Sequence, residues 1–308
     1  MTRIIIDTDI GTNPDDAIAI TLALQSPEIT IEGITTVYGN VDIRSPIANH
    51  LLTLSGKEEI HVYPGISDTL LGNREIFWTG LEEQHITEMT MESTASQHAV
   101  DFIIQSIMNH PGEITLVPIG PLTNIAVAMI KEPQIINNVK EIIMMGGVTR
   151  LGTNGKHLAF MEHNVKSDPE AASIVFRSNA PITMIGLDVT RSIQLSRTDL
   201  IPLSTEKTLT QTLNKMIRSH MEYMNRDFSY LCDPLAIAAI IDRSLIETER
   251  MSIHVDYHPQ YESGQTIGEL NEKGNIQVAL EVDNERFLNL FKSRITGLIK
   301  NERSKIHS

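Results

Sequence analysis

Short apolar runs of strand length alternate with segments of helical period along the first two thirds of the chain. Some helical segments carry boundary residues: Pro14 stands in a first turn, and Gly56 follows a last turn. Because helices make the crossovers between parallel strands, this alternation predicts an α/β fold, with an open, mostly parallel central sheet flanked by helices and a Rossmann-like core. The expected strands cover residues 3–9, 29–40, 113–120, 139–147 and 181–189, and the expected helices cover residues 14–26, 43–56, 121–130 and 167–179.

The last third of the chain is less regular. Residues 200–243 have a mostly helical pattern, and an amphipathic helix is expected around Asn284–Ile299. Neither a Gly/Ser-rich or Pro-rich linker nor a repeat interrupts the sequence, so we expect one domain over residues 1–308 with a flexible tail at about 300–308. Weak periodicity over residues 68–96 predicts a long loop, and such loops are often functional. The expected late strands cover residues 251–258, 265–270 and 276–282.

Charge and cysteine content narrow the class of protein. A formal net charge of −14 without a basic stretch argues against a nucleic-acid partner. The single cysteine, Cys232, permits no internal disulfide and favours a reducing cytoplasm. The N-terminal run Ile4–Ile6 is too short for a signal-peptide core, and no run approaches the roughly 18 apolar residues of a membrane span. We therefore expect a soluble, cytoplasmic protein that binds neither nucleic acid nor membrane.

Four aspartates stand within ten residues directly after the first expected strand: Asp7, Asp9, Asp15 and Asp16. Carboxylates this close repel one another unless a cation lies among them. The alternative is a solvated turn in which Asp15 caps a helix, but Asp7 and Asp9 end a buried strand. Oxygen ligands without a nearby His or Cys are typical of Ca²⁺ or Mg²⁺ sites rather than zinc sites. The spacing does not fit an EF-hand loop, which needs Gly and Glu at the sixth and twelfth positions.

Further polar residues fall near the expected carboxyl ends of strands, where open parallel sheets bind ligands. Asn40 ends the second strand, and Asp233 stands before a helix with Pro234 in its first turn. Glu162 and Asn164 precede a helix that Ser167 or Asp168 would cap. A helix cap remains the alternative for Asp233, and an ordinary polar loop is the alternative for Glu162 and Asn164.

Six segments in order resemble the inosine-uridine-preferring nucleoside hydrolase family. Its N-terminal signature, D-x-D-x-G-x-D-D-A, appears here as DTDIGTNPDDA, with two additional residues between Gly11 and Asp15. The resemblance runs from residue 3 to about residue 295. The other segments are VYGN at 37–40, VPIGPLTNIA at 117–126, MMGG at 144–147, EHNVKSDPEAA at 162–172 and CDPLA at 232–236.

The resemblance implies a Ca²⁺-dependent enzyme of purine or pyrimidine salvage. It would cleave the N-glycosidic bond of a nucleoside to ribose and free base through an oxocarbenium-like transition state. A water activated by the metal would attack, with Asp9 as the general base and Asn164 as a second catalytic residue. Asp7 would support the turn, and the protein would be a homodimer or homotetramer. The implied Ca²⁺ ligands are Asp9, Asp16, Asp233 and the backbone carbonyl of Ile119, and the implied ribose-binding residues are Asp15, Asn40, Asn154, Glu162 and Asn164.

Two positions depart from the family pattern. Cys232 stands where many members carry a His that protonates the leaving base, and a Cys there marks one subgroup; a small, buried thiol is the alternative. His163 replaces an aromatic residue that is common between the Glu and the Asn. Candidate contacts to the base are Trp78, Thr79, Tyr223, Asn225, Arg226 and Cys232, and for Trp78 a partly buried anchor is an equal alternative.

Two other functions stay open on the sequence. One is a nucleoside- or ribose-binding protein that kept the metal site but lost catalysis through Cys232 and the altered loop at residues 74–84. The other is a metal-dependent phosphatase of the haloacid dehalogenase type, which also uses D-x-D after its first strand. That type expects Thr or Val where Gly11 stands, so it is the weaker alternative.

Overall fold

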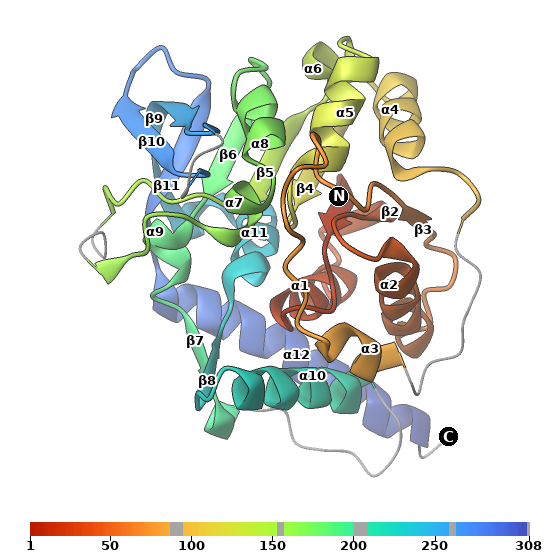
Figure 1. Cartoon of the computed structure of the whole chain (residues 1–308). Helices are drawn as coiled ribbons and strands as arrows, with labels where there is room; N and C mark the ends of the chain where they lie inside the picture. Colours follow the sequence, from red (N-terminus) through yellow and green to blue (C-terminus); the bar gives the residue numbers. More distant parts are fainter. Residues whose placement is uncertain (87–94, 153–156, 200–208, 259–262, 307–308) are drawn as a thin grey trace.

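The computed structural model describes residues 1–86, 95–152, 157–199, 209–258 and 263–306. Within these ranges a nine-stranded sheet has the order β10-β9-β11-β6-β5-β4-β1-β2-β3 (Figure 1). Neighbouring strands from β11 to β3 are parallel, and β9 is antiparallel to β10 and β11. The α/β fold with a mostly parallel sheet is confirmed. The strands are β1 Thr2–Thr8, β2 Ile29–Thr36, β3 Val62–Pro64, β4 Ile114–Pro118, β5 Glu141–Met145, β6 Ile182–Ile185, β9 Ile246–Val255, β10 Thr266–Leu270 and β11 Ile276–Val282.

Helices cover both faces of the sheet (Figure 1). In β1, Ile4 and Ile6 pack into one buried cluster and Ile5 into the other, as the period of two in a strand requires. The first cluster includes side chains of α1, α2, α11 and α12, and the second includes side chains of α4, α5 and α8. The helices are α1 Asp15–Leu24, α2 Val41–Ser55, α3 Leu81–Ile86, α4 Ala99–Asn109, α5 Thr123–Lys131, α6 Ile135–Asn138, α7 His163–Ser167, α8 Pro169–Phe176, α9 Leu187–Thr190, α10 Leu209–Tyr223, α11 Cys232–Ile241 and α12 Asn284–Ile306.

Several element boundaries differ from those expected. The strand expected over 181–189 ends at Ile185, and α9 follows it. Asp188 in α9 accepts hydrogen bonds from the backbone N–H groups of Thr149 (2.8 Å) and Gly152 (3.2 Å), which hold this segment as a helical turn. The expected helical region contains the short strand β8 (Phe228–Tyr230), which pairs with β7 (Gln194–Ser196). The last helix continues past Ile299 to Ile306.

Among the described residues, no helix combines the length and the apolar character that crossing a membrane requires. The long loop expected over residues 68–96 contains the short helix α3, and residues 87–94 of it lie outside the described ranges.

Candidate active site

The acidic turn lies between β1 and α1, at the carboxyl edge of the sheet. Asp15 and Asp16 are the first residues of α1, and Asp233 is the second residue of α11. Pro14 and Leu231 occupy the cap positions of these helices, and neither helix has a side-chain cap hydrogen bond. Helix capping therefore does not explain Asp15 or Asp233.

Three carboxylates from two distant parts of the sequence meet beside this turn. Asp15, Asp16 and Asp233 each offer an oxygen, and these oxygens lie within 4.8 Å of one another. All three side chains are buried, with exposed fractions of 8%, 3% and 3%. Among the described residues, this is the one cluster of His, Cys, Asp and Glu side chains close enough to hold a metal ion.

Burial and mutual repulsion make this acidic group costly to ionise. Burial raises the pKa of Asp15 to about 7, and the charge of Asp9 adds to the effect. The pKa values of Asp16 and Asp233 lie well above their usual range, first because of burial and then because of the neighbouring aspartates. Only a small part of this cost is met by donors, such as Thr8 Oγ1, which bonds Asp16 Oδ1 at 2.5 Å. Buried carboxylates with an all-oxygen donor set fit a hard divalent cation.

Asp9 lies beside this acidic group and faces a histidine. Its Oδ2 lies 3.6 Å from Nε2 of His163. Burial acts to lower the pKa of His163, but Asp9 and Glu162 together raise it overall. The loop after β4 passes directly over Asp9: a Cβ on Gly120 would stand 2.8 Å from the backbone nitrogen of Asp9 and 3.1 Å from its Oδ1. Only glycine allows this close approach, which brings the neighbouring Ile119 to the acidic turn.

Asp7 belongs to the support of the turn. It is 1% exposed, and its Oδ1 accepts from Thr35 Oγ1 (2.5 Å) and Asn124 Nδ2 (2.8 Å). Asn124 also donates to the carbonyl of Thr36 (3.0 Å), so one amide ties β1, β2 and α5 together. Burial raises the pKa of Asp7 to about 7, although both hydrogen bonds act in the opposite direction.

Glu162 and Asn164 are buried at the same edge and are bound to the backbone. Glu162 caps α7, a short helix before α8 that the sequence pattern does not predict. Its oxygens accept from the N–H groups of Asn164, Val165 and Gly147. The amide of Asn164 donates to the carbonyls of Ile119 (2.9 Å) and Met145 (3.0 Å). The expected metal-binding carbonyl of Ile119 is thus also a hydrogen-bond acceptor. Asp168 caps α8, as expected.

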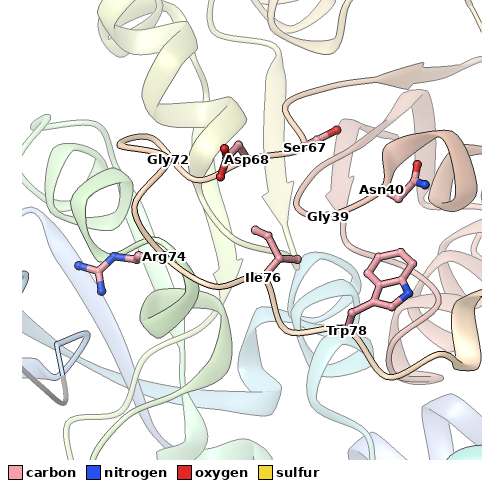
Figure 2. Close-up of a pocket in the computed structure, with 8 residues that line it drawn as sticks. All are labelled: Gly39, Asn40, Ser67, Asp68, Gly72, Arg74, Ile76 and Trp78. Carbon is pink, nitrogen blue, oxygen red and sulfur yellow. The ribbon is translucent and has the colours of Figure 1, made fainter.

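Asn40 and Trp78 line a neighbouring cleft of about 670 Å³ (Figure 2). Asn40 is exposed, and its side-chain oxygen accepts from the N–H of Asp42 at the start of α2. The Trp78 ring lies over the guanidinium of Arg44 at 4.9 Å and packs against Gly39. Trp78 is therefore a packed anchor in this structure, while part of its surface faces the cleft. The other lining residues are Ser67, Asp68, Gly72, Arg74 and Ile76.

The remaining base-side candidates are dispersed. Thr79 donates to Glu82 (2.8 Å), Tyr223 is half exposed at the end of α10, and Arg226 lies over the Phe228 ring at 5.9 Å. None of these three lines the cleft of Figure 2. Asn154 lies outside the described residues.

Cys232 is buried beside the acidic group. Burial raises the pKa of its thiol to about 12, and the charge of Asp15 contributes to this increase. The group is therefore a neutral thiol at physiological pH. The nearby charge of Arg191 acts on both Cys232 and Asp15 and lowers their pKa values, without offsetting burial.

Sequence reasoning missed three residues that touch the acidic turn or lie beside it: Arg44, Glu82 and Arg191. Arg44 and Glu82 are fully buried, although charged residues are rarely buried without a partner. Their local sequence carries no signal for a contact with the acidic turn, because Thr12 lies 32 residues from Arg44 and 70 residues from Glu82. His163 carried the one usable signal, its position between two expected site residues.

Comparison with known proteins agrees with this fold. The model of the "Inosine-uridine preferring nucleoside hydrolase" family matches residues 4–289. Pyrimidine-specific ribonucleoside hydrolases named RihB, from Shigella flexneri and Escherichia coli, are 32% identical over 313 residues, which cover 97% of this chain and 98% of theirs.

Solved structures give the same result. A purine-preferring ribonucleoside hydrolase from Gardnerella vaginalis is 35% identical with a TM-score of 0.83, and the plant nucleoside hydrolase PpNRh1 is 31% identical with a TM-score of 0.84. Both alignments cover 96% of this chain and 99% of the other chain. The family match over nearly the whole sequence, together with these relatives, shows that the chain belongs to the inosine-uridine preferring nucleoside hydrolase family and is an N-glycosyl hydrolase.

Proposed function

We propose that this chain is a Ca²⁺-dependent ribonucleoside hydrolase, which cleaves purine or pyrimidine nucleosides to ribose and free base. The observation that carries the proposal is the buried acidic group of Asp15, Asp16 and Asp233 beside Asp9. Three buried carboxylates with oxygens within 4.8 Å of one another are the donor set that a hard cation requires. Asp9, Asp16, Asp233 and the Ile119 carbonyl are the proposed ligands.

The chemistry needs a nucleophilic water and a stabilised sugar cation. Bound Ca²⁺ would supply a positive centre that orients and polarises the attacking water. Asp9 is the proposed general base. It takes a proton from that water while the water oxygen forms a bond to C1′. The bond between C1′ and the base nitrogen breaks, and its electron pair leaves with the base.

The ribose is proposed to lie against the residues that surround this group. Asp15 accepts a hydrogen bond from a ribose hydroxyl, while the backbone N–H of Asp233 supports its carboxylate. Glu162, Asn164 and Asn40 hold the remaining sugar oxygens, and Asn154 is proposed to join them. Because the amide of Asn164 is already bound to the carbonyls of Ile119 and Met145, its proposed catalytic role is to fix the sugar against the loop after β4.

The leaving base is proposed to depart without a proton from the side chain of residue 232. A thiol with a pKa of about 12 is a poor acid at neutral pH. We therefore place the chain in the subgroup with Cys at this position. The relatives do not fix the base, since one is named pyrimidine-specific and another purine-preferring.

The test is release of free base from inosine, adenosine, guanosine, uridine and cytidine, with Ca²⁺ and after chelation. Asp233→Asn should lower turnover by more than about 100-fold. Changes in groups that only support a metal ligand typically cost roughly 10- to 100-fold, and Asp233 is a proposed ligand itself. Asp101→Asn is the matched control, because Asp101 is an exposed partner of Lys131 on α4. Full turnover by Asp233→Asn or by the chelated protein would refute the proposal.

Two further measurements, nucleoside binding and phosphate release, separate the alternatives. Tight nucleoside binding without base release would identify a non-catalytic binding protein. Phosphate release from phosphoryl substrates, lost in Asp7→Asn, would identify a phosphatase.

We further propose that residues 1–308 form a single domain that works in the cytoplasm as a homodimer or homotetramer. The continuous sheet, which joins strands from both ends of the chain, supports the single domain. The one cysteine is buried and free, which suits a reducing compartment. Light scattering coupled to gel filtration measures the oligomeric state.

A further inference from the structure

Glu82 is a fully buried carboxylate that lies against the acidic turn. Its Oε1 accepts from Thr12 Oγ1 (2.6 Å), and its Oε2 accepts from Thr79 Oγ1 (2.8 Å). Its side chain packs on Gly11, where an added Cβ would stand 3.2 Å from Glu82 Cγ. One carboxylate therefore joins the acidic turn to the segment that carries Trp78 and Thr79.

Arg44 holds the opposite side of the same turn. Its guanidinium is 0% exposed, and its Nη1 donates to the carbonyls of Asp9 and Ile10 and to Thr12 Oγ1 (3.1 Å). A buried cation is costly without an anion nearby. The Thr12 hydroxyl links the two charges, because it accepts from Arg44 and donates to Glu82. Although burial acts to raise the pKa of Glu82, the hydrogen bonds from Thr12 and Thr79 and the charge of Arg44 lower it overall, so the carboxylate stays ionised.

Thr12 lies in the part of the turn that exceeds the family signature in length. Its hydroxyl accepts from Arg44 and donates to Glu82, so both of its hydrogen-bonding functions are used. The longer turn between Gly11 and Asp15 is thus held by side chains from α2 and α3, in addition to its own backbone.

The segment before Glu82 contacts two residues, His163 and Arg44, that in turn contact Asp9. The N–H of Phe77 donates to Tyr38 Oη (2.8 Å), and the Phe77 ring meets the His163 ring edge-on at 5.5 Å. His163 in turn faces Asp9. Trp78 lies over the Arg44 guanidinium, which bonds the Asp9 carbonyl. Two chains of contact therefore connect residues 77–82 to Asp9.

We propose that Glu82 is a positioning residue. It acts through Thr12 and Arg44 to fix the turn that carries Asp9, and it couples this turn to the placement of residues 77–82. The proposal rests on the proposed function, in which Asp9 is the general base and a Ca²⁺ ligand. Glu82 touches neither substrate nor metal in this scheme.

The test compares Glu82→Gln and Thr12→Val with the wild-type chain. Both changes keep the side-chain shape, but the first removes the charge and the second the shared hydroxyl. We expect each to lower kcat and the affinity for Ca²⁺ by about 10- to 100-fold, the usual range for groups that support metal ligands, with a smaller change in KM. The double variant should lose no more than the worse single variant, because both act through one contact.

Trp78 is the only tryptophan in the chain, so its fluorescence reports on the segment directly. We expect acrylamide to quench Trp78 more strongly in Glu82→Gln than in wild type. Glu75→Gln is the matched control, because Glu75 is exposed on the same segment and should leave kcat, Ca²⁺ affinity and quenching unchanged.

Glu82→Gln with wild-type kcat, Ca²⁺ affinity and quenching would overturn the proposal, as would additive effects in the double variant. A variant that lowers only the melting temperature would show a purely structural role and would also overturn it. If the wild-type chain releases no base, the proposed function fails, and the Ca²⁺ affinity and the quenching still decide the role of Glu82.

Discussion

Asp7 is buried, with one carboxylate oxygen bonded to two donors and the other, Oδ2, without a hydrogen-bond partner among the described residues. Burial raises its pKa from 3.8 to about 7, so the folded protein holds a proton there that the unfolded chain releases at lower pH. Where the folded state binds more protons, stability falls as the pH rises. Asp7 therefore lowers the free energy of unfolding progressively between about pH 4 and pH 7.

The fall in stability with rising pH can be tested with Asp7→Asn in Ca²⁺-free protein. The amide oxygen can still accept from Thr35 and Asn124, but the residue no longer titrates. We expect the stability of Asp7→Asn relative to wild type, measured by denaturant unfolding, to increase as the pH rises from about 5 to 7 and to level off above that. Asp101→Asn should show a constant difference, because Lys131 lowers the pKa of Asp101 below this window. A constant difference for Asp7→Asn as well would contradict the assignment.

Cys232 gives the second prediction at this scale. General acids contribute roughly 10²- to 10⁴-fold to rates, but a buried thiol with a pKa of about 12 is a poor acid at neutral pH. Cys232→Ser should therefore keep kcat well within a factor of about 100. Cys232→His should add a new acidic limb to the pH profile, because imidazole titrates near neutrality. A loss of 100-fold or more in Cys232→Ser, measured by base release, would identify the thiol as the acid.

Among the secondary-structure elements, the site depends on two loops at the sheet edge: the turn after β1 and the turn after β4. They touch at Gly120, where a Cβ would meet the Asp9 backbone at 2.8 Å and Val37 Cγ1 at 3.0 Å. Gly120→Ala should push the loops apart, cost about 1–3 kcal/mol in unfolding free energy and lower both kcat and Ca²⁺ affinity. Calorimetry measures the stability and the Ca²⁺ affinity.

Gly56→Ala controls for the loss of a glycine. Gly56 has a φ of +64° at the end of α2, and an added Cβ there would meet nothing within 4 Å. It should cost about 1–2 kcal/mol through backbone strain alone and leave Ca²⁺ affinity unchanged. Equal effects of both variants on Ca²⁺ affinity would remove the steric argument.

Elements with a strong local signal could be predicted from the sequence. The alternation of short apolar runs with segments of helical period predicted the parallel core, Gly56 marked the end of α2, and Asp168 was one of the two expected caps of α8. The short elements β7, β8, α7 and α9 were not predicted, because none of them is set apart by an apolar run or a helical period of its own. Glu162 was consequently assigned to a loop, although it caps α7.

The site was predictable only in part, for a different reason. The clustering of Asp15, Asp16 and Asp233 follows from their places at strand ends and helix starts. The support from Arg44 and Glu82 depends on contacts that form only when α2 and α3 pack against the acidic turn. No local pattern encodes such contacts.

At the scale of the whole molecule, the acidic group joins two distant segments of the chain. Asp15 and Asp16 start α1 near the N-terminus, and Asp233 starts α11 more than two hundred residues later. These helices lie side by side on one face of the sheet, so repulsion between their first residues opposes their packing. A cation bound there would attract all three carboxylates and so link the start of α1 to the start of α11.

Asp16→Asn should therefore reverse its effect on stability according to the metal. The amide keeps an acceptor for Thr8 but removes one buried charge, so the Ca²⁺-free variant should melt at a higher temperature than Ca²⁺-free wild type. With Ca²⁺ at about 100 times its dissociation constant, wild type gains about 2.7 kcal/mol, or several degrees, and the variant gains little because it has lost a ligand. The two melting temperatures should change order on addition of Ca²⁺, while Asp101→Asn follows wild type in both conditions. If Asp16→Asn melts below wild type without Ca²⁺, the acidic group is stable by itself, and the physical argument for a metal at this site loses its basis.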